Sequence, residues 1–132
     1  MSLSRIMHRE VISVTPTTSV RAVAKKMKDE RIGSVLVKKG GKFVGIVTDT
    51  DVVRKGVAVG KDLTKLTADK IMSSPVATIE DIRNVHDAHD MMGDLGVRHL
   101  CITKAGEIVG IISVRDLLLY FQQVSEPKIT QD

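Results

Sequence analysis

The sequence predicts an α/β (α+β) fold built from two copies of one βαββα unit. First, the chain repeats itself at a constant shift of 65 residues, which carries Met7 onto Met72 without a gap. Second, each copy has one apolar stripe at helical spacing, flanked by short extended segments rich in β-branched residues. Third, hydrophobic residues make up 42% of the chain but aromatic residues only 2%, so the core must consist of aliphatic side chains and methionine.

The repeat is the most informative of these observations. It aligns residues 5–55 with residues 70–120, and the identical pairs include Ile6 with Ile71, Val20 with Val85, Met27 with Met92, Gly45 with Gly110 and Asp51 with Asp116. One copy of about 55 residues would be marginal alone. We therefore expect the two copies to form one folding unit with a pseudo-two-fold axis and a ligand cleft between them.

Each copy is predicted to contain the same elements in the same order. In the first copy these are a strand over residues 11–14, a helix capped by Ser19, a hairpin of strands over 34–38 and 43–48, and a helix over 49–55. In the second they are a strand over 76–79, a helix capped by Asn84, strands over 99–103 and 108–113, and a helix over 114–124. Ser and Asn side chains accept the free N–H groups of a first helical turn, and the hairpin glycines supply positive φ.

These elements set the expected domain limits. The first repeat spans residues 1–60, a linker spans 61–68, the second repeat spans 69–124, and a polar tail spans 125–132.

Composition limits the class of function. The formal charge of +4 comes from interspersed acidic and basic residues, which suits anionic small molecules and only weakly suits nucleic acid. The single cysteine, Cys101, allows no intrachain disulfide and fits a reducing cytoplasm. With no apolar run of membrane-spanning length and no export signal, we expect a cytoplasmic protein without membrane contact.

The closing motif of each copy carries a family resemblance. It reads Gly45-Ile46-Val47-Thr48-Asp49-Thr50-Asp51 in the first copy and Gly110-Ile111-Ile112-Ser113-Val114-Arg115-Asp116 in the second. Together with the doubled βαββα order and the Ile-Met start, this resembles the tandem CBS-domain pair, or Bateman module, over residues 6–121. The resemblance implies a non-enzymatic regulatory module that binds an adenine nucleotide, AMP foremost and ADP or ATP also. It needs no cofactor, and it acts on a partner that would be a separate chain.

Asp51 and Asp116 are the first candidates for ligand binding. Each lies early in a helix that follows a strand, where a carboxylate can accept two O–H bonds from the vicinal hydroxyls of a ribose. The alternative is an acid stabilised by the helix dipole, which we rank second because the duplicated motif is otherwise unneeded for capping. Thr48 and Ser113 could equally bond a ribose or phosphate oxygen or cap the next helix.

The remaining candidates follow from the resemblance. It places an apolar slot for the adenine ring at Ile12, Val47, Ala77 and Ile112. It also places phosphate-binding cations at Arg98 and His99, and it pairs them with the ribose site of the other copy, at Asp51. The equivalent positions in the first copy are the neutral Gly33 and Ser34, so Asp116 is expected to have fewer cations, with Arg115 and Arg54 as possible substitutes.

Other reactive side chains are assigned structural roles. His86 and His89 lie three residues apart on a helix, but a metal site needs at least three converging ligands, so we predict no metal. His89 is expected to be half-buried, and Cys101 is expected to be a small core residue. No nucleophile and base pair suggests an enzyme.

Two further functions remain open beside nucleotide sensing. One is a protein-interaction or dimerisation module that leaves the ligand site unused, and the other is weak nucleic-acid binding. We also expect a homodimer, which would form through the apolar candidates Met91, Leu95, Leu118 and Tyr120.

Overall fold

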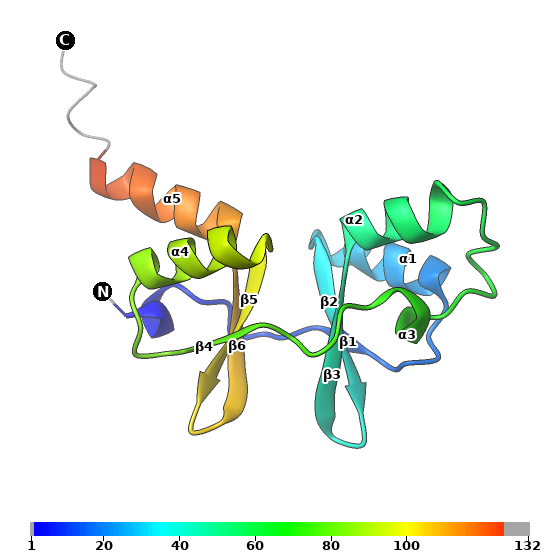
Figure 1. Cartoon of the computed structure of the whole chain (residues 1–132), viewed down its shortest axis with the longest axis horizontal. Coiled ribbons are helices and arrows are strands. Elements are labelled where there is room, and N and C mark those ends of the chain that lie inside the picture. Colours follow the sequence, from blue (N-terminus) through cyan, green and yellow to red (C-terminus); the bar gives the residue numbers. More distant parts are fainter. Residues whose placement is uncertain (1, 126–132) are drawn as a thin grey trace, which may run out of the picture. The chain divides into compact units, whose positions relative to one another are not determined.

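The computed structural model describes residues 2–125 and confirms the predicted fold class (Figure 1). It contains two three-stranded sheets of the same topology. The first sheet comprises β1 (Ser13–Val14), β2 (Ser34–Lys39) and β3 (Lys42–Thr48), with α1 (Val20–Glu30) between β1 and β2. The second comprises β4 (Thr78–Glu80), β5 (His99–Lys104) and β6 (Glu107–Ser113), with α4 (Val85–Leu95) between β4 and β5.

In both sheets the first strand pairs parallel to the second, and the second pairs antiparallel to the third. The parallel pair needs a crossover, which α1 and α4 provide. A helical segment follows each third strand: α2 (Asp49–Val52), continued by the π-helical turn η2 (Val53–Val57), and α5 (Val114–Ser125). Of the tail predicted at residues 125–132, residues 126–132 lie outside the described residues.

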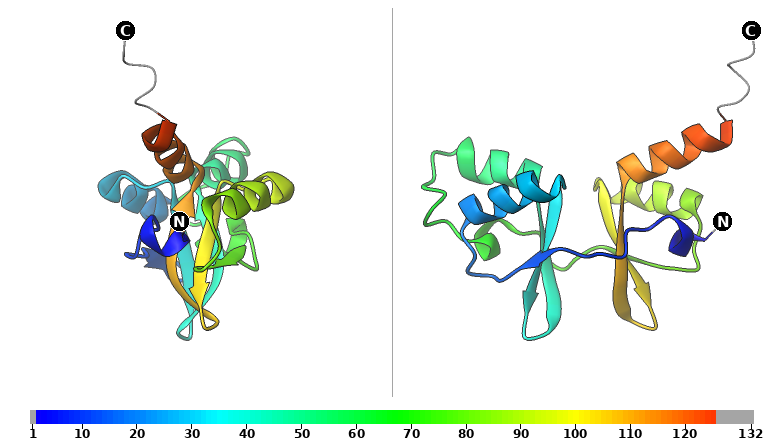
Figure 2. Two further views of the ribbon diagram at one scale, coloured as in Figure 1. Left: turned by 90° about the vertical axis from the view of Figure 1, so that its left-hand side faces the viewer. Right: turned by 180° about the vertical axis from the view of Figure 1, so that it is seen from behind.

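The local signals in the sequence act as predicted. The Ser19 hydroxyl accepts the Ala22 N–H, and the Asn84 side chain accepts the Asp87 N–H. At the hairpin turns, Gly40 and Gly41 in one copy and Ala105 and Gly106 in the other all have positive φ. Two adjacent residues with positive φ match the right-handed twist of the flanking strands. Each turn extends beyond the helices of its own sheet (Figure 2).

The chain divides into two compact units, and these do not coincide with the sequence repeats. The Asp51 unit is Val11–Val76, whereas the Asp116 unit combines the chain up to Glu10 with the chain from Ala77 onward. The reason is an exchange of short segments. The backbone of His8 pairs with Ile111 of β6, and the equivalent Ser73 pairs with Ile46 of β3. Each repeat therefore gives its first segment to the sheet of the other.

We call residues 3–10 and the equivalent residues 68–75 the exchanged segments. They begin with the short helices η1 (Leu3–Arg5) and α3 (Ala68–Ile71), which carry apolar side chains. Leu3 and Met7 are buried in the core of the Asp116 unit, as Ala68 and Ile71 are in the core of the Asp51 unit. Each unit thus has its own hydrophobic core, and the expectation that both units form one folding unit stays a prediction. The predicted cleft and pseudo-two-fold axis concern the arrangement of the two units and stay predictions.

Cys101 lies in β5 and is 1% exposed, as expected of a core residue. Burial raises the pKa of its thiol to about 11, because the charged thiolate is poorly solvated there. The thiol is therefore protonated at neutral pH and is a poor nucleophile.

None of the helices within residues 2–125 is both long and apolar enough to cross a bilayer.

Candidate functional site

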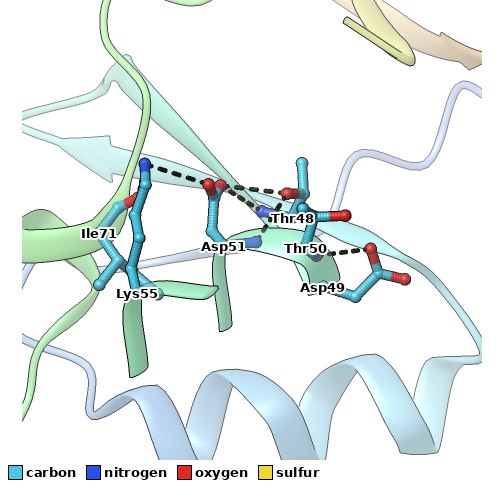
Figure 3. A network of polar contacts seen from close by, with 6 residues as sticks. All are labelled: Thr48, Asp49, Thr50, Asp51, Lys55 and Ile71. Carbon is cyan, nitrogen blue, oxygen red and sulfur yellow. Dashed lines mark hydrogen bonds and ion pairs between the residues drawn. The ribbon is translucent and has the colours of Figure 1, made fainter. Parts of the chain in front are cut away.

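The junction of β3 and α2 holds the first candidate carboxylate (Figure 3). Thr48 is the N-cap of α2, and its hydroxyl accepts the N–H of Asp51. In return, Asp51 Oδ2 accepts the Thr48 N–H at 3.0 Å and the Thr48 hydroxyl at 3.1 Å. This reciprocal arrangement is a capping box.

The second oxygen of Asp51 faces a cation. Lys55 Nζ lies 3.1 Å from Asp51 Oδ1, and it also donates to the carbonyl oxygen of Ile71 at 3.2 Å. Lys55 therefore connects the carboxylate to the exchanged segment of its unit (Figure 3). The Asp51 side chain is only 13% exposed, whereas that of Lys55 is 48% exposed. The carboxylate is largely enclosed, whereas the side chain that pairs with it is about half exposed to solvent.

The junction of β6 and α5 repeats this geometry in the other unit. Asp116 Oδ2 accepts the Ser113 N–H at 2.8 Å and the Ser113 hydroxyl at 3.0 Å, and the Asp116 N–H returns a bond to that hydroxyl. The side chain that contacts the second carboxylate oxygen is a different one, however. His8 Nε2 lies 2.7 Å from Asp116 Oδ1, so the exchanged segment contacts the carboxylate directly.

These contacts correct one step of the sequence reasoning. Asp51 and Asp116 are themselves part of the caps, so the duplicated motif is needed for capping. A carboxylate has about four lone-pair directions. Each aspartate receives three polar contacts from described residues, and one direction remains. Accepting both hydroxyls of a ribose requires Lys55 or His8 to move away.

Lys55 and His8 are site residues that the sequence analysis missed. Lys55 could have been found, because it follows Asp51 by four residues on a helix, which is the spacing of an ion pair. The capping box could also have been found from its Ser/Thr-x-x-Asp spacing. His8 gives no such signal, because 108 positions separate it from Asp116.

The basic pair predicted to hold phosphate lies in the Asp116 unit. Arg98 is exposed directly before β5, and its carbonyl oxygen accepts the Val114 N–H at 2.9 Å. His99 is the first residue of β5 and is in register with Ser113, which places it beside the Asp116 cap. The predicted pairing of Arg98 and His99 with Asp51 involves residues of both units, and it stays a prediction. Arg115 is exposed in the first turn of α5.

The four apolar candidates divide into two kinds. Val47 and Ile112 have no exposed surface and belong to the hydrophobic cores of their own units. Ile12 and Ala77 are half-buried and pack against those cores. The structure gives Val47 and Ile112 a packing role, and contact of all four with an adenine ring stays a prediction.

The histidines of α4 differ from expectation. His89 is 66% exposed at its side chain, not half-buried, because the apolar stripe of α4 passes through Val85, Ala88 and Met92 instead. His86 and His89 both lie near the ring of Phe121. Within residues 2–125, no three His, Cys, Asp or Glu side chains converge to hold a metal ion.

Comparison with known proteins identifies the family. The model of the CBS domain matches residues 3–58 and again residues 68–123. The chain therefore belongs to the CBS-domain family and contains two CBS domains, a pair that forms a ligand-binding regulatory module.

Individual relatives agree with this assignment. The uncharacterized protein MK0525 of Methanopyrus kandleri is 37% identical over 120 residues, which cover 89% of this chain and 61% of that protein. The chain thus spans less than two thirds of this relative. A protein with CBS domains from Burkholderia ambifaria has a TM-score of 0.90 at 26% identity, and each chain is covered completely. A hexameric CBS-CP12 protein from bloom-forming cyanobacteria has a TM-score of 0.86 at 26% identity, over 96% of this chain and 71% of that one.

Proposed function

We propose that the capped carboxylates Asp51 and Asp116 bind the ribose of an adenine nucleotide, and that the chain senses this nucleotide in the cytoplasm to regulate a separate partner protein. One observation carries the proposal. Each unit holds an aspartate in a capping box, while the side chain that contacts its outer oxygen, Lys55 or His8, is about half exposed or more. A ribose diol can replace that side chain without disturbing the helix start.

The side chain displaced from the aspartate can then contact the ligand. Lys55 or His8, once displaced, is a hydrogen-bond donor for the phosphate attached to the same ribose. The carboxylate gains two hydroxyl donors, and the displaced Lys55 or His8 gains phosphate oxygens as acceptors. AMP provides both parts, and adenosine provides only the first.

A thermal-shift series tests the ligand class. AMP is expected to raise the melting temperature in a concentration-dependent manner, because a ligand that binds only the native state stabilises it. The 2′-deoxy form of AMP should bind more weakly by about 1–3 kcal/mol, because a buried charged acceptor loses one partner. GMP serves as the control for the base.

Two outcomes would contradict parts of the proposal. Equal shifts with AMP and 2′-deoxy-AMP would remove the ribose role of the two aspartates. No shift with any nucleotide, combined with self-association, would favour a dimerisation module whose ligand site is unused.

The surface of the Asp116 unit supports self-association with a second copy. Leu95 of α4 and Leu118, Leu119 and Val124 of α5 are between 49% and 64% exposed. Of the four residues predicted for this face, Met91 and Tyr120 are instead half-buried against the core. A two-fold dimer would cover the exposed leucines, and the structural relative from cyanobacteria is itself an oligomer.

Sedimentation tests this interface. At tens of micromolar, roughly the range in which weak dimers form, we expect a dimer that Leu118→Asp converts to a monomer. Val59→Asp provides the control, because Val59 is 58% exposed but lies in the other unit. A wild-type chain that sediments only as a monomer would show that these leucines do not form the interface.

A further inference from the structure

A groove runs along one side of the Asp116 unit, between the exchanged segment and α5. It is lined by residues 4–9 and by Tyr120, Gln123 and Val124. Its volume of about 1030 Å³ is at the upper end of the range of small-molecule sites, about 300–1,000 Å³. All of its residues belong to the same unit, so its shape does not depend on the arrangement of the two units.

The groove is positively charged. Arg5, His8 and Arg9 line it, and no carboxylate is among its described lining residues. The guanidinium of Arg9 donates to the Ser4 carbonyl oxygen at 2.8 Å. That acceptor is neutral, and no ion pair of Arg9 with a carboxylate occurs among the described residues. Arginine presents a planar set of donors that fits phosphate oxygens in pairs. These features favour an anion with several oxygens.

The groove continues from the candidate ribose site. His8 contributes to both, since its ring contacts Asp116 at 2.7 Å and also lines the groove. Tyr120 follows Asp116 by four residues on α5, which places both on one helix face. A ribose bound to Asp116 would therefore lie beside the basic end of the groove.

The other unit has no equivalent set of charges. At the positions that correspond to Arg5, His8 and Arg9, the second exchanged segment has Lys70, Ser73 and Ser74. The hydroxyl of Ser74 donates to the Val44 carbonyl oxygen at 2.7 Å instead of facing a ligand. Both units thus have the carboxylate, but these positions hold two arginines and a histidine in one unit and a lysine and two serines in the other.

We infer that this groove binds the phosphate chain of a nucleoside di- or triphosphate whose ribose is held by Asp116, with Arg5 and Arg9 as its cations and His8 as a further hydrogen-bond donor. The inference rests on the proposed function and refines it. Asp116 is not short of positive charge, as the neutral Gly33 and Ser34 had suggested, because its own unit provides the cations. The Asp116 site favours longer phosphate chains, and the Asp51 site favours the monophosphate.

Calorimetry on the full chain tests the role of the arginines. An Asp51→Asn background confines the measurement to the Asp116 site, and Arg5→Gln/Arg9→Gln is added to it. The affinity for ATP is expected to fall about ten- to a hundred-fold, the loss typical of one charged hydrogen bond. The affinity for adenosine, which has no phosphate, should change less than about twofold, within ordinary surface effects. Lys39→Gln/Lys104→Gln is the control, because it removes the same charge at equivalent, exposed hairpin positions.

Inorganic tripolyphosphate provides a second readout that needs no nucleoside. In amide NMR spectra it should shift the signals of residues 4–9 and 120–124, and Arg5→Gln/Arg9→Gln should abolish those shifts. If these shifts occur while no adenine nucleotide binds, then the groove binds polyphosphate but the proposed function is wrong. If ATP binds equally well to the arginine and lysine variants and tripolyphosphate leaves these signals unchanged, then the groove does not bind the phosphate chain. The proposed binding of adenine nucleotides is not contradicted by that result.

Discussion

Replacing Gly110 by alanine is expected to destabilise the protein by about 2–4 kcal/mol, from overpacking and weakened hydrogen bonds. A Cβ at this position would lie 2.6 Å from Met7 Sδ and 2.9 Å from the carbonyl oxygen of His8. The methionine side chain can move alone, but the carbonyl can move only with the backbone of the exchanged segment. The His8 N–H donates to the Ile111 carbonyl at 2.9 Å, and the Ile111 N–H donates back to the His8 carbonyl at 3.0 Å. Both bonds must weaken if the exchanged segment retreats.

Chemical denaturation in urea measures this effect, and Gly93→Ala is the matched control. Gly93 lies in α4, and a Cβ there would meet nothing within 4 Å. Its substitution should stabilise the protein by up to about 1 kcal/mol, through helix propensity alone. Gly45→Ala should resemble Gly110→Ala, because the Ser73 carbonyl oxygen would lie 3.0 Å from the new Cβ. If Gly110→Ala proves as harmless as Gly93→Ala, the exchanged segment does not lie this close to β6.

The local structure of this chain was predictable because its signals are local. Ser19 and Asn84 cap their helices, and the glycine turns join the strands, through contacts that extend over three or four residues. The constant shift between the copies then lets each element confirm its counterpart. The class of fold followed from these elements and their order.

The exchange of segments could not be predicted in the same way. Residues 6–8 and 71–73 have similar sequences, and each is short enough to pair with either sheet. The choice is made by tertiary contacts: Leu3 and Met7 fill the core around Leu100 and Ile112, which lies about a hundred residues away in the chain. For the same reason the contact between His8 and Asp116 left no trace in the sequence. Through this exchange each repeat completes the hydrophobic core of the other unit.

The largest effect on binding is expected from Asp51→Asn, which should nearly abolish the binding of AMP, whereas Asp116→Asn should leave the tighter binding phase intact. Asparagine keeps the shape and a capping oxygen, so the helix start survives, but the charge that attracts the ribose hydroxyls is lost. A hydrogen bond to a charged group is worth about 1.5–3 kcal/mol. If Arg98 and His99 serve this site as predicted, they should make it the dominant site for a monophosphate, and Arg98→Ala should weaken AMP more than adenosine.

Asp87→Asn separates a loss of ligand contact from a loss of stability. Asp87 occupies the same position in the capping box of α4 that Asp51 occupies in that of α2, and it has no predicted ligand. Both substitutions should therefore lower the melting temperature to a similar extent, but only Asp51→Asn should remove the AMP signal in calorimetry. If Asp116→Asn abolishes AMP binding and Asp51→Asn does not, then Arg98 and His99 serve the carboxylate of their own unit. The register of His99 with Ser113 would then be the relevant geometry, and the predicted pairing across the repeats would be wrong.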